Sequence, residues 1–195
     1  MVGLVGDVRG RLRAFGAQDV ALTAVFSALM AATTYFAVPL PFGGLMHFGN
    51  TVMWVASILF GGLIGGLAGG IGGMIVDLLL APIWAPFTVF CKLASGLAAG
   101  LVSGEVRSVN RSATARVVLG VISGAAVNWL AYAPVYYLLL GPGATVLWLW
   151  EFVSPVALIT YVVTVIVALA VMRAYPRAMS YKSSIRDRVR ASRKG

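Results

Sequence analysis

Two ionisable side chains interrupt the long apolar stretches of this chain. Asp77 and Lys92 each lie inside a run of apolar residues. Ionisable groups inside apolar helices are rare, are usually paired and often mark functional sites. Both residues are expected near the same ends of two consecutive helices, within reach of each other. Two alternatives stay open: the pair forms a structural salt bridge, or its charges line a cavity for a ligand.

A stripe of polar side chains accompanies this pair. Asn128, Tyr132 and Tyr136 are spaced at i, i+4 and i+8, so they share one face of a helix. Nearly every ionisable, amide or tyrosine side chain of the apolar segments is expected in the same half of the molecule. This distribution predicts a polar cavity that is open at one end and closed at the other by tight packing. The candidate binding residues are His47, Asn50, Asp77, Trp84, Thr88, Lys92, Asn128, Tyr132, Tyr136 and Glu151.

Aromatic rings and amides in this set suit a planar, hydrogen-bonding small molecule. Alternatives remain for single members. Trp84, Trp148 and Trp150 are typical of anchors at a membrane interface. His47 is more typical of a loop residue than of a ligand-binding residue. Glu151 lies where the last predicted loop, 141–147 with its Gly141-Pro142-Gly143 turn signal, enters the last helix.

The composition predicts that lipid surrounds most of the chain. Of 195 residues, 60% are hydrophobic and 11% are charged, and the mean hydropathy is +0.93. A single helix over 48–81 would be about 50 Å long, far more than the ~30 Å of a hydrocarbon core, so this stretch is predicted to cross twice, with a turn near 60–63. The apolar runs lie at about 20–38, 48–61, 64–81, 86–103, 114–140 and 148–172.

The distribution of positive charge predicts the orientation. Fourteen of the fifteen Lys and Arg residues lie in three segments: 9–13, 107–116 and 173–194. Basic residues that flank membrane spans stay on the cytoplasmic side. We therefore predict an all-α bundle of six transmembrane helices with both termini cytoplasmic; five helices is the alternative. The predicted parts are a tail over 1–19, a membrane domain over 20–173 and a basic tail over 174–195.

Small residues are predicted to form helix–helix contacts. Glycines recur every four residues over 61–73 and 96–104, and again at Gly120 and Gly124, which is typical of close helix packing. Ala24, Ala28 and Ala32 form a similar stripe on the first helix. Either internal packing explains that stripe or it is a docking surface for another membrane protein.

Several classes of function are disfavoured. The basic tail lacks interleaved aromatic residues, so we expect it to face anionic lipid and not nucleic acid. A single cysteine, Cys91, excludes a disulfide framework and a CxxC metal site. We expect no metal, no cofactor and no enzymatic activity, because Asp77, Glu151 and His47 lack catalytic spacing. No GxxxxGK[ST] loop is present, so the chain does not drive transport with ATP by itself.

One part of the sequence resembles a known family. It runs from His47-Phe48-Gly49-Asn50 through 59–62 to Asp77, and continues with 85–88 and Lys92. It is similar to the substrate-binding S component of energy-coupling factor (ECF) transporters, in the riboflavin-type group. The resemblance implies a six-helix plasma-membrane subunit that binds a vitamin from outside. It also implies association with a membrane T component, through Ala24, Ala28 and Ala32, and with two cytosolic ATPases.

The resemblance leaves the vitamin open among riboflavin, pyridoxine, a hydroxymethylpyrimidine and other heterocycles. It places the pocket in the first outer loop and the last three helices. A self-contained channel or facilitator, or a structural or assembly protein of the membrane, remains an alternative. A channel would require a polar path through the inner half of the bundle, which the sequence does not indicate.

Overall fold

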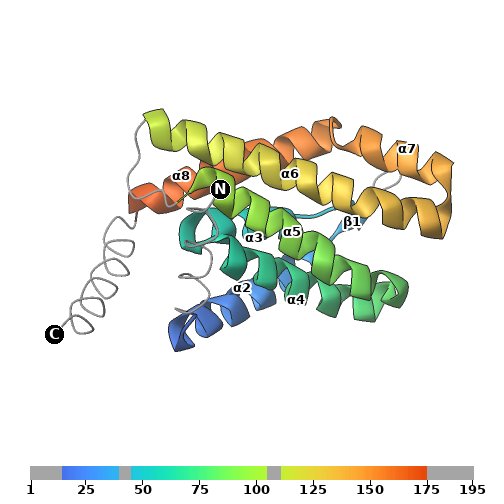
Figure 1. Cartoon of the computed structure of the whole chain (residues 1–195), viewed down its shortest axis with the longest axis horizontal. Helices are drawn as coiled ribbons and strands as arrows, with labels where there is room; N and C mark the ends of the chain where they lie inside the picture. The colour runs from blue at the N-terminus through green and yellow to red at the C-terminus, as the bar shows by residue number, and fades with distance from the viewer. Residues whose placement is uncertain (1–14, 40–44, 105–110, 175–195) are drawn as a thin grey trace, which may run out of the picture.

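The computed structural model describes residues 15–39, 45–104 and 111–174 of the chain (Figure 1). Residues 1–14, 40–44, 105–110 and 175–195 lie outside the described residues, and they include most of the two predicted tails. In chain order the elements are α2 (Ala17–Tyr35), β1 (Val38–Pro39), β2 (Leu45–Met46), α3 (Gly49–Phe60), α4 (Gly62–Leu80), η1 (Pro82–Trp84), α5 (Ala85–Ser103), α6 (Arg111–Leu140), α7 (Pro142–Glu151) and α8 (Pro155–Ala174).

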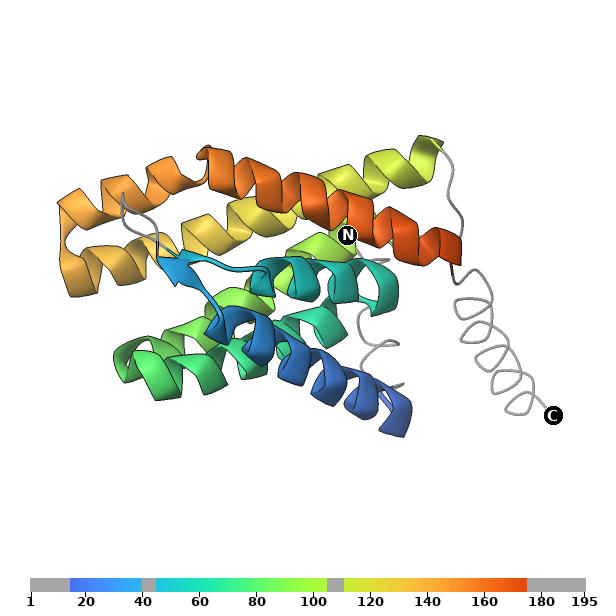
Figure 2. The same ribbon diagram turned by 180° about the vertical axis from the view of Figure 1, so that it is seen from behind.

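The helices run along one long axis, as two opposite views of the molecule show (Figures 1 and 2). The η1 turn between α4 and α5 and the turn between α6 and α7 lie at the same end, which is called the η1 end below. The strands β1 and β2 pair antiparallel in the connection between α2 and α3, with Val38 opposite Met46. Apart from this short pair, the elements of the described ranges are helical.

Five of the described helices are long and apolar enough to cross a membrane, and α3 is a shorter apolar helix. The chain is therefore a multi-pass membrane protein, as its composition predicts. Six crossings and cytoplasmic termini remain predictions.

The predicted division of 48–81 into two helices is confirmed. The two helices meet at Gly61, whose φ is +109°. Side chains other than hydrogen strongly disfavour this region of φ, so glycine permits the sharp reversal between α3 and α4.

The prediction of one helix over 148–172 is wrong. The structure has two helices there, α7 and α8, separated by a turn at 152–154. Ser154 Oγ accepts a hydrogen bond of 3.1 Å from the backbone N–H of Ala157, and Pro155 occupies the first position of α8. This arrangement starts a new helix, because serine satisfies a free N–H and proline needs none. The predicted loop 141–147 is likewise wrong, since α7 already begins at Pro142.

Close glycine packing joins α4 to α5, as the sequence predicts. A side-chain carbon added at Gly96 would collide with the backbone of Gly66, and one added at Gly100 would collide with the backbone of Gly62. Backbones that approach this closely tolerate only hydrogen as a side chain. The seam holds the two helices that carry Asp77 and Lys92 in a fixed relation.

The first helix packs on α4 through one face and leaves another face uncovered. Thr23, Ser27 and Met30 are its buried residues. Ala24 and Ala28 are exposed, as is Ala32. Internal packing within the described residues therefore does not explain the alanine stripe.

Candidate functional site

The centre of the candidate site is the buried ammonium of Lys92 on α5. Its Nζ donates hydrogen bonds to Asn50 Oδ1 at 2.7 Å and to Asn128 Oδ1 at 3.0 Å. It also lies 5.3 Å from the ring centroid of Tyr132. A buried cation requires such acceptors, because the free energy of removing it from water is otherwise not recovered. The three contacts join α3, α5 and α6 at one point.

Asp77 lies beside this cluster and not in an ion pair with Lys92. The ammonium is hydrogen-bonded to the two asparagines instead, and the half-buried Asp77 interacts with the side chain of Thr88. Tyr132 donates a 2.7 Å hydrogen bond from its hydroxyl to Thr88 Oγ1. Asp77 is thus connected to the site through Thr88, so the salt-bridge alternative is wrong.

Aromatic rings cover the η1 side of this polar cluster. The ring of Trp84 lies 4.8 Å from that of Tyr136 and 6.4 Å from that of Tyr132. The ring of Trp148, on α7, lies 4.5 Å from that of Tyr136 and 5.6 Å from that of Tyr132. Trp84 and Trp148 thus pack against the tyrosines of α6, and an additional role as membrane anchors stays a prediction.

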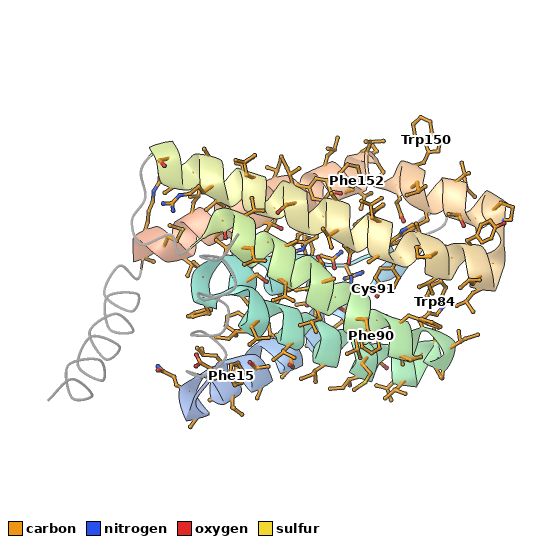
Figure 3. All side chains as sticks on the ribbon, viewed as in Figure 1. Phe15, Trp84, Phe90, Cys91, Trp150 and Phe152 are labelled. Atoms are coloured by element: carbon orange, nitrogen blue, oxygen red, sulfur yellow. The ribbon has the colours of Figure 1, made fainter. Side chains whose placement is uncertain are left out.

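Trp150 differs from these two tryptophans. Its side chain is 69% exposed, and in Figure 3 it points away from the other helices. In the same view Trp84 lies beside α6 near the η1 end. The position of Trp150 suits an interface anchor. It is therefore a natural control residue for experiments on its neighbours.

Two buried donors at the site have no hydrogen-bond acceptor in the described structure: Asn128 Nδ2 and Trp129 Nε1. The asparagine side chain is fully buried. Leaving a buried N–H without an acceptor costs ~1–3 kcal/mol. Both N–H groups can therefore donate to an oxygen or nitrogen lone pair of a bound molecule.

His47 and Glu151 lie at the margins of the cluster. Gly49 N donates a 3.2 Å hydrogen bond to His47 Nδ1, at the start of α3. Burial, reinforced by the charge of Lys92, lowers the pKa of His47 to about 4. Glu151 lies at the end of α7 and not at the start of the last helix, and it interacts electrostatically with Tyr136 and Tyr161.

The structure thus brings together most of the predicted residues and adds two that sequence reasoning omitted from the set, Trp129 and Trp148. A signal for Trp129 was available, because it precedes Tyr132 by three residues and Tyr136 by seven and so shares their helix face. No comparable signal exists for Trp148, which reaches the site only because α7 folds back along α6 (Figure 1). Within the described residues, no group of three or more His, Cys, Asp or Glu side chains could hold a metal ion.

Comparison with known proteins identifies the family. A family model described as "ECF-type riboflavin transporter, S component" matches residues 15–177. The chain belongs to this family. The S component is the substrate-binding subunit of an ECF transporter, and the family is a transporter class and not a class of enzymes.

A solved structure supports the same fold for this S component. Its description reads "Structure and mechanism of the S component of a bacterial ECF transporter", and it aligns with a TM-score of 0.55 and 19% sequence identity. The alignment covers 80% of this chain and 94% of the other. No curated protein sequence matches the chain.

Proposed function

We propose that this S component binds a planar, vitamin-like heterocycle, riboflavin or a related ring, from the exterior. The observation that carries the proposal is the Lys92 cluster: a buried ammonium held by Asn50 and Asn128 beside aromatic rings. Asn128, which belongs to the cluster, has a free donor at Nδ2, and the next residue along α6, Trp129, has one at Nε1. Lone pairs at the edge of a flat heterocycle would accept hydrogen bonds from these donors while its faces contact the aromatic side chains.

The bundle beyond the Lys92 cluster supports a binding subunit over a channel. Trp54 Nε1 donates to Ser95 Oγ at 2.9 Å, and Ser95 Oγ donates to the backbone oxygen of Gly124 at 2.8 Å. Trp54 and Ser95 are fully buried. Their hydrogen bonds are satisfied by each other and by the backbone, so they close the space between α3, α5 and α6 and provide no polar path.

We propose further that this subunit acts in the plasma membrane with a T component and two ATPase subunits. The family implies these partners, and the chain has no phosphate-binding loop of its own. The exposed stripe of Ala24, Ala28 and Ala32 is the surface that the family resemblance assigns to the T component. Small side chains there would allow a second helix to approach the backbone closely.

A thermal-unfolding screen tests the ligand proposal. The purified wild type would be heated with riboflavin, pyridoxine, a hydroxymethylpyrimidine or other flat heterocycles. A ligand at ~100 times its Kd adds about 2.7 kcal/mol to the free energy of unfolding, so at least one compound should raise Tm clearly. Lys92→Met should lose this increase and Trp150→Ala should keep it. If no compound stabilises the wild type, the proposal fails.

A further inference from the structure

The indole of Trp148 lies between two other rings. It stacks on Trp129 with centroids 4.8 Å apart and an interplanar angle of 12°. It also stacks on Tyr136 with centroids 4.5 Å apart and an angle of 15°. Trp129 and Tyr136 are seven residues apart on α6, which is about 10.5 Å along the helix axis. That spacing leaves room for one ring between them, and the Trp148 indole occupies it.

Three aromatic residues of α6 surround the Trp148 indole, and the space between them is called here the aromatic slot. They are Trp129, Tyr132 and Tyr136. Tyr132 closes its back, since its ring meets that of Trp148 edge-on at 5.6 Å and 62°. The slot accepts a flat ring between two parallel faces, which is a favourable geometry for aromatic stacking. The same Tyr132 contacts Lys92, so the slot is continuous with the polar cluster.

Trp148 fills the slot without satisfying the polar groups beside it. An indole has one N–H donor and no acceptor, and the Nε1 of Trp148 already donates to the backbone oxygen of Trp129 at 3.1 Å. Asn128 Nδ2 and Trp129 Nε1 therefore stay without acceptors. A planar heterocycle with carbonyl or imine groups would match the shape of the indole and also accept these hydrogen bonds.

The helix that carries Trp148 is short and has a break at each end. It follows Gly141, whose φ is +85°, and it ends at the turn 152–154 before Pro155. Its main packing partner is α6, and its opposite side is apolar and exposed at Val146, Leu147 and Trp150. The rings of the slot are thus the principal contacts that hold Trp148 in place.

We propose that Trp148 occupies the slot in which the planar ring of the ligand binds, so that ligand and indole compete for it. Binding then requires α7 to move away from α6, with Gly141 and the turn 152–154 as the hinges. The apparent Kd then equals the intrinsic Kd divided by the fraction of molecules in which Trp148 has left the slot. This inference rests on the proposed function, and it names the subsite and the class of ring that enters it.

Calorimetric titration of Trp148→Ala with the ligand identified in the thermal screen tests the inference. Loss of the competing indole should lower Kd by about 5- to 150-fold, the range expected when two aromatic contacts no longer oppose binding. Trp150→Ala, on the same helix but directed away from the slot, should bind as the wild type does. An unchanged or higher Kd for Trp148→Ala would overturn the inference, because Trp148 would then support binding or be irrelevant to it.

A second measurement avoids dependence on that variant. The five tryptophans can be labelled as 5-fluorotryptophan in the wild type, and Trp148→Phe identifies the resonance of Trp148. Saturating ligand should shift this resonance strongly and expose it to a paramagnetic reagent, whereas that of Trp54 should change little. A Trp148 resonance unaltered by saturating ligand would refute competition. If the wild type binds no heterocycle at all, the proposed function itself fails.

Discussion

Lys92 is the residue on which the candidate site depends most. Its ammonium is buried and its acceptors are the side-chain oxygens of Asn50 and Asn128. Asn50→Leu keeps the shape of the side chain but removes an acceptor, and leaving a buried charge short of a partner is destabilising by about 3–5 kcal/mol. We expect this variant to show a clearly lower Tm than the wild type in the absence of ligand.

The double variant Asn50→Leu with Lys92→Met removes the charge together with one of its two acceptors, so the buried charge no longer lacks a partner. Asn128 Oδ1 then loses its donor, which costs ~1–3 kcal/mol, less than an uncompensated buried charge. The Tm of the double variant should therefore lie above that of Asn50→Leu alone and below that of the wild type, while ligand binding is lost. A double variant as unstable as Asn50→Leu alone would show that Asn50 does not stabilise the protein by compensating the charge of Lys92.

His47 predicts a pH dependence. It is the only histidine of the chain, and its pKa is lowered from 6.5 to about 4. Between pH 6.5 and about pH 4, His47 is protonated in the unfolded chain but neutral in the folded protein. The free energy of unfolding therefore decreases as the pH falls across this window. The loss at pH 5 is ~2 kcal/mol.

Thermal unfolding of wild type and His47→Gln at pH 7 and pH 5 measures this effect. The glutamine variant keeps a polar side chain but cannot titrate. On acidification, the Tm of the wild type should fall by more degrees than that of the variant. Equal decreases in Tm would mean that His47 is free to protonate in the folded protein.

At the scale of residues, spacing in the sequence predicts the stripe of Asn128, Tyr132 and Tyr136 well, because helical periodicity alone places them on one face. It does not predict the partners of Lys92. Asp77 is the obvious counter-charge, yet Lys92 is hydrogen-bonded to Asn50 and Asn128. Which residues of α3 and α6 face Lys92 depends on the rotation of each helix about its axis. That rotation follows from packing across the whole bundle and leaves no local signal.

At the scale of elements, the close packing of α4 against α5 leads to a prediction about stability. Gly100→Ala would drive a side-chain carbon into the backbone of Gly62, and forcing extra atoms into a packed contact costs ~1–3 kcal/mol. Gly143→Ala is the matched control, since nothing lies within 4 Å of the added carbon there. Thermal unfolding should show a lower Tm for the first variant and an unchanged or slightly higher Tm for the second. Equal behaviour would contradict the packing account.

The elements also show where sequence reasoning succeeds and fails. The length of 48–81 and the glycine at its middle predict the break at Gly61. The break before α8 was missed because hydropathy continues across it, although Ser154-Pro155 is itself a helix-start signal. Gly141-Pro142-Gly143 indicated a loop, but Pro142 is the first residue of α7, since proline is well suited to that position.

For the whole molecule, the exposed alanine stripe predicts how the subunit associates. Ala28→Trp places a bulky side chain at its centre and should abolish co-purification with the T component and ATPases, while ligand binding stays intact. Leu29→Trp is the control, because Leu29 is also exposed but lies about 100° around the helix. Loss of the partners in both variants, or in neither, would show that the stripe is not the contact surface.

The central claim is that the Lys92 cluster binds a flat heterocycle, and calorimetric titration tests it most directly. The wild type should show saturable single-site binding of at least one such compound. Asn128→Leu, shown by Tm to be folded, should bind about 30- to 100-fold more weakly, since a hydrogen bond to a charged or buried group is lost. Absence of saturable binding by the wild type, or equal affinity in the folded Asn128→Leu protein, would contradict the claim.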